Sequence, residues 1–243
     1  MRVVLLLMLA VETTAQNIVP NPGFEKYEHC PNVFMQPNDS SIVTGWYSPT
    51  LATPDYFNTC GGPLTNVPNN AAGVAEAHAG KAYMGLAMYV NTTGNYSEYL
   101  QTKLLLPMVK DSTYCLTLFY RLASYSMYGS NGMGMYLSNE AVRATHDELL
   151  EYPAQLVDSI EPAEGDALRW MKLQAIYKAK GGEQYLTIGC LKGMLKYPVC
   201  ANVYLPQRKE HRNTAYYYID DVSIVKLSPQ NYYSCFDTSL KFK

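Results

Sequence analysis

The sequence has none of the short motifs that mark the common catalytic sites. It contains no G-x-S-x-G nucleophile motif and no H-E-x-x-H zinc motif. The glycines of "GSNGMGMY" (129–136) are not followed by the Lys-Ser/Thr pair of a phosphate-binding loop. The histidines are widely scattered, so we expect surface or structural roles for all four: His29, His78, His146 and His211. These absences predict a protein that is not an enzyme.

A pair of carboxylates suited to sugar hydrolysis is also missing. Glycosidases place two carboxylates about 5–10 Å apart across the sugar, and no strand of the sequence presents an E-x-D-x-x-E pattern. Four acidic residues could in principle converge, but nothing in the sequence places them together: Asp55, Glu76, Glu98 and Glu140. A carbohydrate-active enzyme with an unrecognised site is therefore only the third of three candidate functions.

Long apolar runs and blocks of one charge are scarce. The 243-residue chain has a formal net charge of −2 and no basic block, so nucleic acid and anionic membranes are poor candidates as partners. The apolar run at 3–10 is too short to span a bilayer, and no later run is long enough. Because it follows Arg2 and precedes small residues near Ala15, it is typical of a secretory signal peptide rather than of a buried first strand. We expect residues 1–16 to be the signal peptide, residues 17–243 to be one domain, and the protein to be secreted or to lie in the cell envelope.

An even number of cysteines, six, indicates disulfides in an exported chain. Six cysteines allow 15 sets of pairs, and the sequence alone does not choose among them. Zinc is the alternative, but no C-x-x-C pair is present to bind it. Cys190 and Cys200 are close along the chain, which suggests one pair. Cys30 and Cys60 lie in two loop-like stretches that could meet, which suggests a second. Cys115–Cys235 would then be the third pair.

Much of the chain has the pattern of short β-strands separated by Gly, Pro and Asn. "KGGEQ" (180–184) is a plausible hairpin connection. Only residues 146–162 have some helical character in their sequence, and Pro153 would interrupt a helix there. Alternating or β-branched runs predict strands at 83–90, 96–106, 113–123, 132–138, 169–179, 183–191 and 215–227. This pattern predicts an all-β antiparallel sandwich.

Residues 31–80 predict an ordered layer of long loops. They are rich in Pro, Asn and Gly, but their aromatic residues argue against disorder, since disordered tracts contain few of them. Sugars present apolar C–H faces edged by hydroxyl groups, so aromatic rings beside Asp and Asn side chains on loops suit them. The alternative is structural, with Trp46 capping the core and Asp55 anchoring its loop. Two clusters are candidates for a ligand site: Trp46, Tyr47, Asp55, Tyr56 and Asn58 in this layer, and Tyr125 and Tyr128 just beyond a core strand.

Two stretches at opposite ends of the chain resemble one known family. "NIVPNPGFEKY" (17–27) and "YYYIDDVSI" (216–224) are similar to the first and last strands of galactose-binding-like jelly rolls, which include many carbohydrate-binding modules of secreted glycosidases. "AHAGKAYMGL" (77–86) is similar to the turn into the strand that follows their first loops. "YSEYLQTKL" (96–104) and "GGEQYLTIG" (181–189) also resemble exported envelope proteins in which this module precedes an OmpA-like domain. The resemblance implies a jelly-roll β-sandwich with long ordered loops and a carbohydrate-binding role at the envelope.

The last predicted strand contains two adjacent carboxylates, Asp220 and Asp221. Because strand side chains alternate between faces, one of the two is expected to point with the buried residues, where an unpaired carboxylate is costly. The first strand often lies beside the last, which would bring Glu25 close, and carboxylates that meet repel unless a cation joins them. The resemblance implies a structural calcium bound by Glu25, Asp220 or Asp221, and backbone oxygens near Gly80 and Lys81. The alternative is an Asp that accepts backbone N–H groups or pairs with a Lys or Arg.

Together these observations predict a non-catalytic exported module that binds a glycan through a loop-borne aromatic site and is stabilised by calcium. The main alternative is a structural or adhesion domain of the bacterial envelope that contacts other proteins without a small ligand. The expected partner is a glycan or another envelope component, with no nucleic acid and no membrane-spanning segment.

Overall fold

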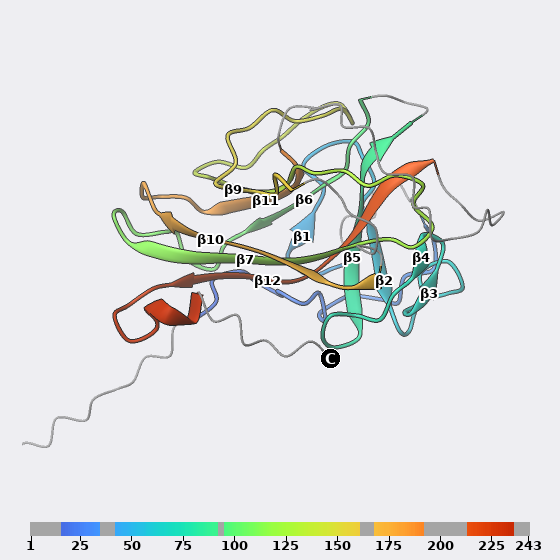
Figure 1. The fold of residues 1–243 in the computed structure, drawn as a ribbon, viewed down its shortest axis with the longest axis horizontal. Helices are drawn as coiled ribbons and strands as arrows, with labels where there is room; N and C mark the ends of the chain where they lie inside the picture. Colours follow the sequence, from blue (N-terminus) through green and yellow to red (C-terminus); the bar gives the residue numbers. More distant parts are fainter. Residues whose placement is uncertain (1–15, 35–41, 92–94, 161–167, 192–212, 236–243) are drawn as a thin grey trace, which may run out of the picture.

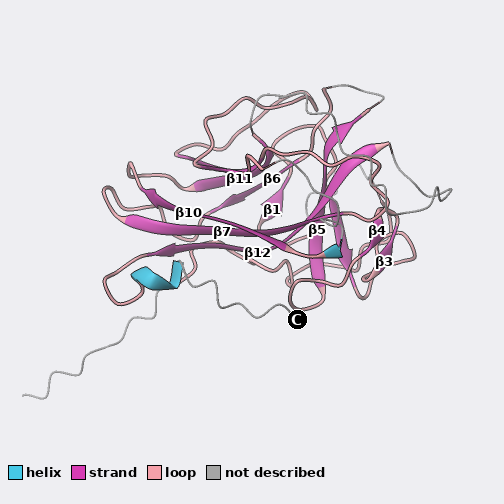
Figure 2. Ribbon diagram, viewed as in Figure 1, coloured by secondary structure: helices cyan, strands magenta, loops and turns pink. Residues whose placement is uncertain are grey.

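The alternating runs of the sequence form two five-stranded antiparallel sheets. The computed structural model describes residues 16–34, 42–91, 95–160, 168–191 and 213–235 (Figure 1). Sheet I has the order β1 (Trp46–Tyr47), β6 (Tyr99–Lys103), β11 (Tyr185–Cys190), β8 (Met133–Ser138) and β9 (Leu156–Val157). Sheet II has the order β10 (Met171–Lys178), β7 (Thr113–Leu122), β12 (Thr214–Lys226), β5 (Ala82–Val90) and β2 (Asp55–Asn58). A small sheet pairs β3 (Asn69–Asn70) with β4 (Gly73–Val74), and the 3-10 helix η2 (Tyr232–Cys235) follows β12 (Figure 2).

The two sheets share one apolar core, as side-chain alternation requires. Along β7, every second side chain from Tyr114 to Leu122 is buried in this core. Sheet I contributes Leu100, Met135 and Ile188, which are at most 1% exposed. This arrangement confirms the predicted all-β jelly-roll sandwich, and the seven predicted strands correspond to β5, β6, β7, β8, β10, β11 and β12.

The connection between β10 and β11 is not the predicted hairpin. β10 is an edge strand of sheet II, whereas β11 lies inside sheet I, so residues 180–184 cross from one sheet to the other. Gly181 and Gly182 have φ of 99° and 90°, which favour glycine and let the chain change direction. The Glu183 carboxylate then accepts the N–H groups of Lys180 (2.7 Å) and Gly181 (2.8 Å) and the Tyr177 hydroxyl (2.7 Å). These bonds stabilise the crossing.

The outer face of sheet I is covered by a segment that we name the strap, residues 139–155. Gln101 on β6 donates to the Val142 carbonyl (3.0 Å) and accepts the Val142 N–H (2.8 Å), and the Tyr99 hydroxyl accepts the Leu150 N–H (2.8 Å). These contacts hold the strap against the sheet in an extended path that leads into β9. The helical character expected for 146–162 is therefore not seen in the described part, 146–160, which contains no helix.

The outer face of sheet II is covered only in part. Residues 59–80, which we name the covering layer, include β3 and β4 and place Val67, Ala72 and Ala75 over the rings of β2, β5 and β12. The Tyr218 hydroxyl donates to Asn70 (2.8 Å) beneath this layer. The predicted packing of the long loops is therefore confirmed for the described residues. Among these residues the covering layer packs over β2, β5 and β12, and we name the outer face along β10 and at Phe119 of β7 the open strip; Cys115 and Thr117 of β7 are buried.

Two of the suggested disulfides are present, Cys30–Cys60 and Cys115–Cys235. Cys190 is buried at the end of β11, but Cys200 lies outside the described residues, so that third pair stays a prediction. The predicted signal peptide also lies outside them, apart from Gln16. In the described part of the chain, no helix has the length and apolar character needed to cross a membrane.

Candidate functional site

Trp46, the first residue predicted to meet a ligand, lies in the core. Its side chain is 2% exposed and packs against Phe24, with ring centroids 5.2 Å apart. The indole N–H donates to the carbonyls of Pro20 (3.2 Å) and Asn21 (3.1 Å). This is the capping role that the sequence left open as the alternative, because the ring closes the core beside the first described residues.

Three further predicted residues are buried with it. The Tyr56 hydroxyl donates to the Phe24 carbonyl (3.0 Å) and accepts from Asn58 (2.7 Å), while Asp55 accepts the Tyr216 hydroxyl (2.6 Å). They are buried because β2 pairs along its whole length with β5. In the described part of the loop layer, these three side chains are buried in internal hydrogen bonds and are not exposed to a ligand, as the prediction required.

Tyr47 stays half-exposed on sheet I, where its hydroxyl accepts from Gln101 (3.1 Å). With Trp46, Asp55 and Tyr56 it lines a cavity of about 40 Å³ at the edge between β1 and β2. A cavity of that size holds about three water molecules, and a sugar ring needs far more. Tyr125 and Tyr128 are half-buried elsewhere, Tyr125 against the covering layer and Tyr128 against Tyr89.

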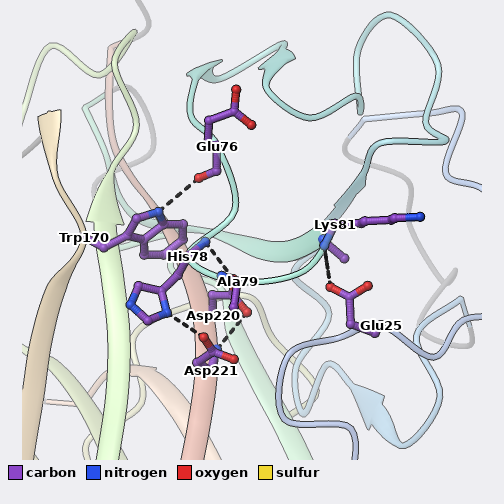
Figure 3. A network of polar contacts seen from close by, with 9 residues as sticks. Glu25, Glu76, His78, Ala79, Lys81, Trp170, Asp220 and Asp221 are labelled. Atoms are coloured by element: carbon purple, nitrogen blue, oxygen red, sulfur yellow. Dashed lines mark hydrogen bonds and ion pairs between the residues drawn. The ribbon is translucent and has the colours of Figure 1, made fainter. Parts of the chain in front are cut away.

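The two chain ends do meet at the acidic residues, as predicted from the sequence (Figure 3). Glu25 accepts the N–H groups of Lys81 (2.7 Å) and Ala82 (3.1 Å). Asp220 accepts the N–H groups of His78 (3.0 Å), Ala79 (3.2 Å) and Asp221 (2.8 Å). We name Glu25, Asp220 and Asp221 the carboxylate clasp. Lys81 contacts the clasp through its backbone N–H, which Glu25 accepts. Glu25 and Asp220 thus hold the chain where the covering layer ends and β5 begins.

A β-bulge explains why two consecutive aspartates can sit in this strand. The pairing of β12 with β7 slips between Asp220 and Ser223, and Asp221 has φ of 46°, a conformation that Asp tolerates better than most residues. Core side chains continue at Val222, three residues after Ile219 instead of two. Asp220 is 0% exposed and accepts backbone N–H groups, whereas Asp221 is half-exposed, so one of the two is buried, as expected from the sequence.

The clasp carries an electrostatic cost that its N–H groups reduce. Burial and the nearby charge of Asp221 raise the pKa of Asp220 to about 8, against the effect of three N–H bonds. A Cβ on Gly23 would lie 3.3 Å from Asp221 Oδ1 and 3.6 Å from Asp220 Oδ1, so these oxygens approach one small space. Such oxygens suit calcium, but in the described ranges no three His, Cys, Asp or Glu side chains form a metal-binding group. A cation would need backbone or water oxygens as well, and calcium stays a prediction.

Beside the clasp lies an aromatic cluster, of which Figure 3 shows His78 and Trp170. The imidazole of His78 stacks on Phe119, with centroids 3.8 Å apart and planes at 21°, and its Nδ1 contacts Asp221 Oδ2 at 2.5 Å. The ring of Trp170 lies edge-on to His78 at 5.9 Å and to Tyr83 at 6.0 Å. Its indole N–H donates to the Glu76 carbonyl (3.0 Å). A half-exposed indole is thus fixed in one orientation.

Polar side chains continue from this cluster along the strip. Lys172 on β10 lies directly opposite Phe119 on β7, and Gln174 lies opposite Thr117, to which it donates (3.0 Å). We name Trp170, His78, Phe119, Lys172 and Gln174 the Trp170 ledge. The sequence did contain a signal for it, because Trp170, Lys172 and Gln174 alternate with Met171 and Leu173, which pack toward the core.

A second acidic pair lies inside the fold. Of the four acids considered above, Glu98 and Asp55 come together, 1% and 4% exposed. Glu98 accepts the Ala87 N–H (2.6 Å) and the Tyr96 hydroxyl (2.7 Å). Burial, and then the charge of Asp55, raise the pKa of Glu98 to about 8. All these bonds are internal, so the pair belongs to the interior of the fold.

No protein-family model and no curated protein matches this chain. Solved structures share its general architecture. Two are the CBM22-1 and CBM22-2 xylan-binding domains from Paenibacillus barcinonensis Xyn10C, with TM-scores of 0.39 and 0.40 and identities of 12% and 13%. They match 88% and 80% of this chain and 96% and 99% of their own. The K1 adhesin domain of Lys-gingipain from Porphyromonas gingivalis W83 has a TM-score of 0.36 and 13% identity, over 79% of this chain and 96% of that one. Similarity at this level shows nothing about the ligand of this chain.

Proposed function

We propose that this protein is a non-catalytic exported module that binds a glycan on the Trp170 ledge. The observation that carries the proposal is the half-exposed indole, held by its bond to Glu76 and by two neighbouring rings. A sugar ring offers an apolar C–H face edged by hydroxyl groups, so it needs a flat ring and hydrogen-bonding groups side by side. Because the indole is already fixed, little side-chain entropy is lost when a ligand binds.

The open strip supplies the groups that would bond to the hydroxyls. Lys172 and Gln174 project from β10 on the same face as Trp170, and Arg121 lies on the same face of the neighbouring strand β7. The strap covers the corresponding face of sheet I, and the covering layer fills the other half of sheet II. The ledge therefore combines an aromatic ring, the exposed Lys172, the half-buried Gln174 and a rigid sheet.

Export is part of the proposal. Two disulfides in the described residues fit an oxidising compartment outside the cytosol. The sequence resemblance to envelope proteins makes peptidoglycan fragments and envelope polysaccharides the first glycans to test.

A structural calcium at the carboxylate clasp is proposed as well. Its support is the approach of Asp220 and Asp221 oxygens to the space beside Gly23, with Glu25 Cγ 4.0 Å from the same point. Such an ion would offset the repulsion between the carboxylates and stabilise the join between the chain ends. It would bind beside the ledge and take no part in holding the glycan.

Affinity electrophoresis against a panel of polysaccharides, together with a glycan array, tests the proposed function. We expect the protein to bind at least one glycan, and Trp170→Ala to weaken that binding by about tenfold or more. Tyr233→Ala is the matched control, since Tyr233 is 80% exposed on η2. Lys172→Ala is a second test, in which we also expect weaker glycan binding. Because Lys172 is exposed and is not part of the core, weaker binding in this variant would not come from unfolding. Absence of binding to every glycan, or equal loss in the control, would refute the proposal.

A further inference from the structure

One end of the sandwich has a tip made of two connections, β6–β7 (104–112) and β10–β11 (179–184), at the left in Figure 1. Five backbone hydrogen bonds of 2.8 to 2.9 Å join them, among them Met108 N–H to Glu183 and Gly182 N–H to Met108. The buried Glu183 carboxylate holds the turn of the second connection. The two connections are thus one rigid unit.

The outside of this tip is apolar. Leu104 and Met108 are 4% and 2% exposed and fix the first connection to the core. The residues between and after them are held outward, so Leu105, Leu106 and Val109 are 54%, 59% and 52% exposed. Three aliphatic side chains exposed so close together on a rigid tip are not needed for the fold, and such patches mark interaction surfaces.

Lysines surround the apolar residues. Lys103, Lys110 and Lys180 are exposed, and Lys178 pairs with Asp111 at 3.0 Å. The connections approach so closely that a Cβ on Gly181 would lie 2.7 Å from Lys110 Cβ, which places Lys110 beside Lys180. Among the acids here, Glu183 is buried and Asp111 is paired, while Glu140 is exposed after Asn139, which contacts Gly182. Four lysines and three carboxylates leave the tip with a net charge of +1, on a chain of net charge −2.

We propose that this tip docks on the surface of a bilayer that contains anionic phospholipid. Leu105, Leu106 and Val109 enter the boundary between headgroups and acyl chains, and the lysines contact lipid phosphates. The charge selects an anionic surface, and the aliphatic side chains select one with an apolar layer beneath it. No basic block is visible in the sequence because these lysines come from segments about 70 residues apart that only folding joins. This inference is independent of the proposed glycan site, which lies elsewhere on sheet II.

Vesicle co-sedimentation tests the proposal, with purified protein that lacks the predicted signal peptide. Vesicles of phosphatidylcholine alone are compared with vesicles that contain one third phosphatidylglycerol. We expect sedimentation with the anionic vesicles only, and a loss of binding at high salt. Lys110→Glu with Lys180→Glu, and separately Leu106→Ser with Val109→Ser, are each expected to weaken binding about tenfold or more.

Leu51→Ser is the matched control, since Leu51 is 65% exposed away from the tip and its loss should leave binding unchanged. All substituted side chains are exposed, and a thermal melt of each variant confirms that it folds. Sedimentation with neither vesicle, equal sedimentation with both, or equal loss in Leu51→Ser overturns the proposal.

Discussion

Substitution of Glu98 by Gln should change how the stability of this protein depends on pH. Glu98 is 1% exposed, and burial together with Asp55 raises its pKa to about 8 from an ordinary value of 4.5. A carboxyl group with a raised pKa binds its proton more tightly in the folded chain than in the unfolded one. The contribution of Glu98 to the stability of the fold is therefore fully present below its pKa in the unfolded chain, and it is lost as the pH rises toward 8. Each pKa unit corresponds to about 1.4 kcal/mol, so the full loss is on the order of 5 kcal/mol.

Glutamine imitates the protonated carboxyl group at this position. Its oxygen can accept the Ala87 N–H, and its amide N–H can donate to the Tyr96 hydroxyl. Urea unfolding at several pH values between 5 and 8 measures the effect. We expect Glu98→Gln to be more stable than the wild type at pH 8 and to lose less stability as the pH rises. Glu148→Gln is the control, since Glu148 is exposed. The same pH dependence in the wild type and Glu98→Gln would refute the reasoning.

Three further predictions concern the covalent and polar links of the fold. Asp220→Ala should destabilise the protein by about 3 kcal/mol in urea unfolding, because three backbone N–H groups lose their acceptor; a change below about 0.5 kcal/mol would contradict this. Removal of calcium with EGTA should lower the Tm, and added CaCl₂ should restore it; an unchanged Tm in metal-free protein would leave N–H anchoring as the whole explanation of the clasp. Cys115→Ser with Cys235→Ser should lower the free energy of unfolding by about 4 kcal/mol, since that disulfide joins residues separated by 120 positions. An unchanged urea midpoint in this double variant would contradict that contribution.

Strand positions could be predicted from the sequence because apolar and β-branched runs broken by Gly, Pro and Asn are local patterns, even where a strand such as β5 is buried on both faces. The assignment of strands to sheets could not. "KGGEQ" has the composition of a hairpin turn, but Glu183 bonds to the turn backbone and the chain crosses between sheets. The bulge at Asp221 is hidden for a similar reason. The carboxylate of Asp220, beside the bulge, accepts the N–H groups of residues 78 and 79, more than 140 positions away.

The ligand site was harder to predict, because the chemistry of a tryptophan does not say which way it points. Trp46 is followed by Tyr47 and Ser48, and Trp170 follows Arg169, so both have polar residues within two positions. Trp46 is buried because the carbonyls of Pro20 and Asn21 accept its N–H inside the fold. Trp170 shares a face with Lys172 and Gln174, and that alternation was available in the sequence. The carboxylate clasp was predictable in outline, since a family resemblance links the two chain ends.

The most direct test of glycan binding at the Trp170 ledge is an NMR titration of the two indole N–H signals with the glycan found by screening. Trp46 lines the small cavity, and Trp170 lies on the ledge, so the two signals report on the two places where a ligand has been predicted. We expect the Trp170 signal to move with saturation while the Trp46 signal stays in place. Movement of the Trp46 signal alone, or of neither signal at saturation, would contradict binding at the ledge.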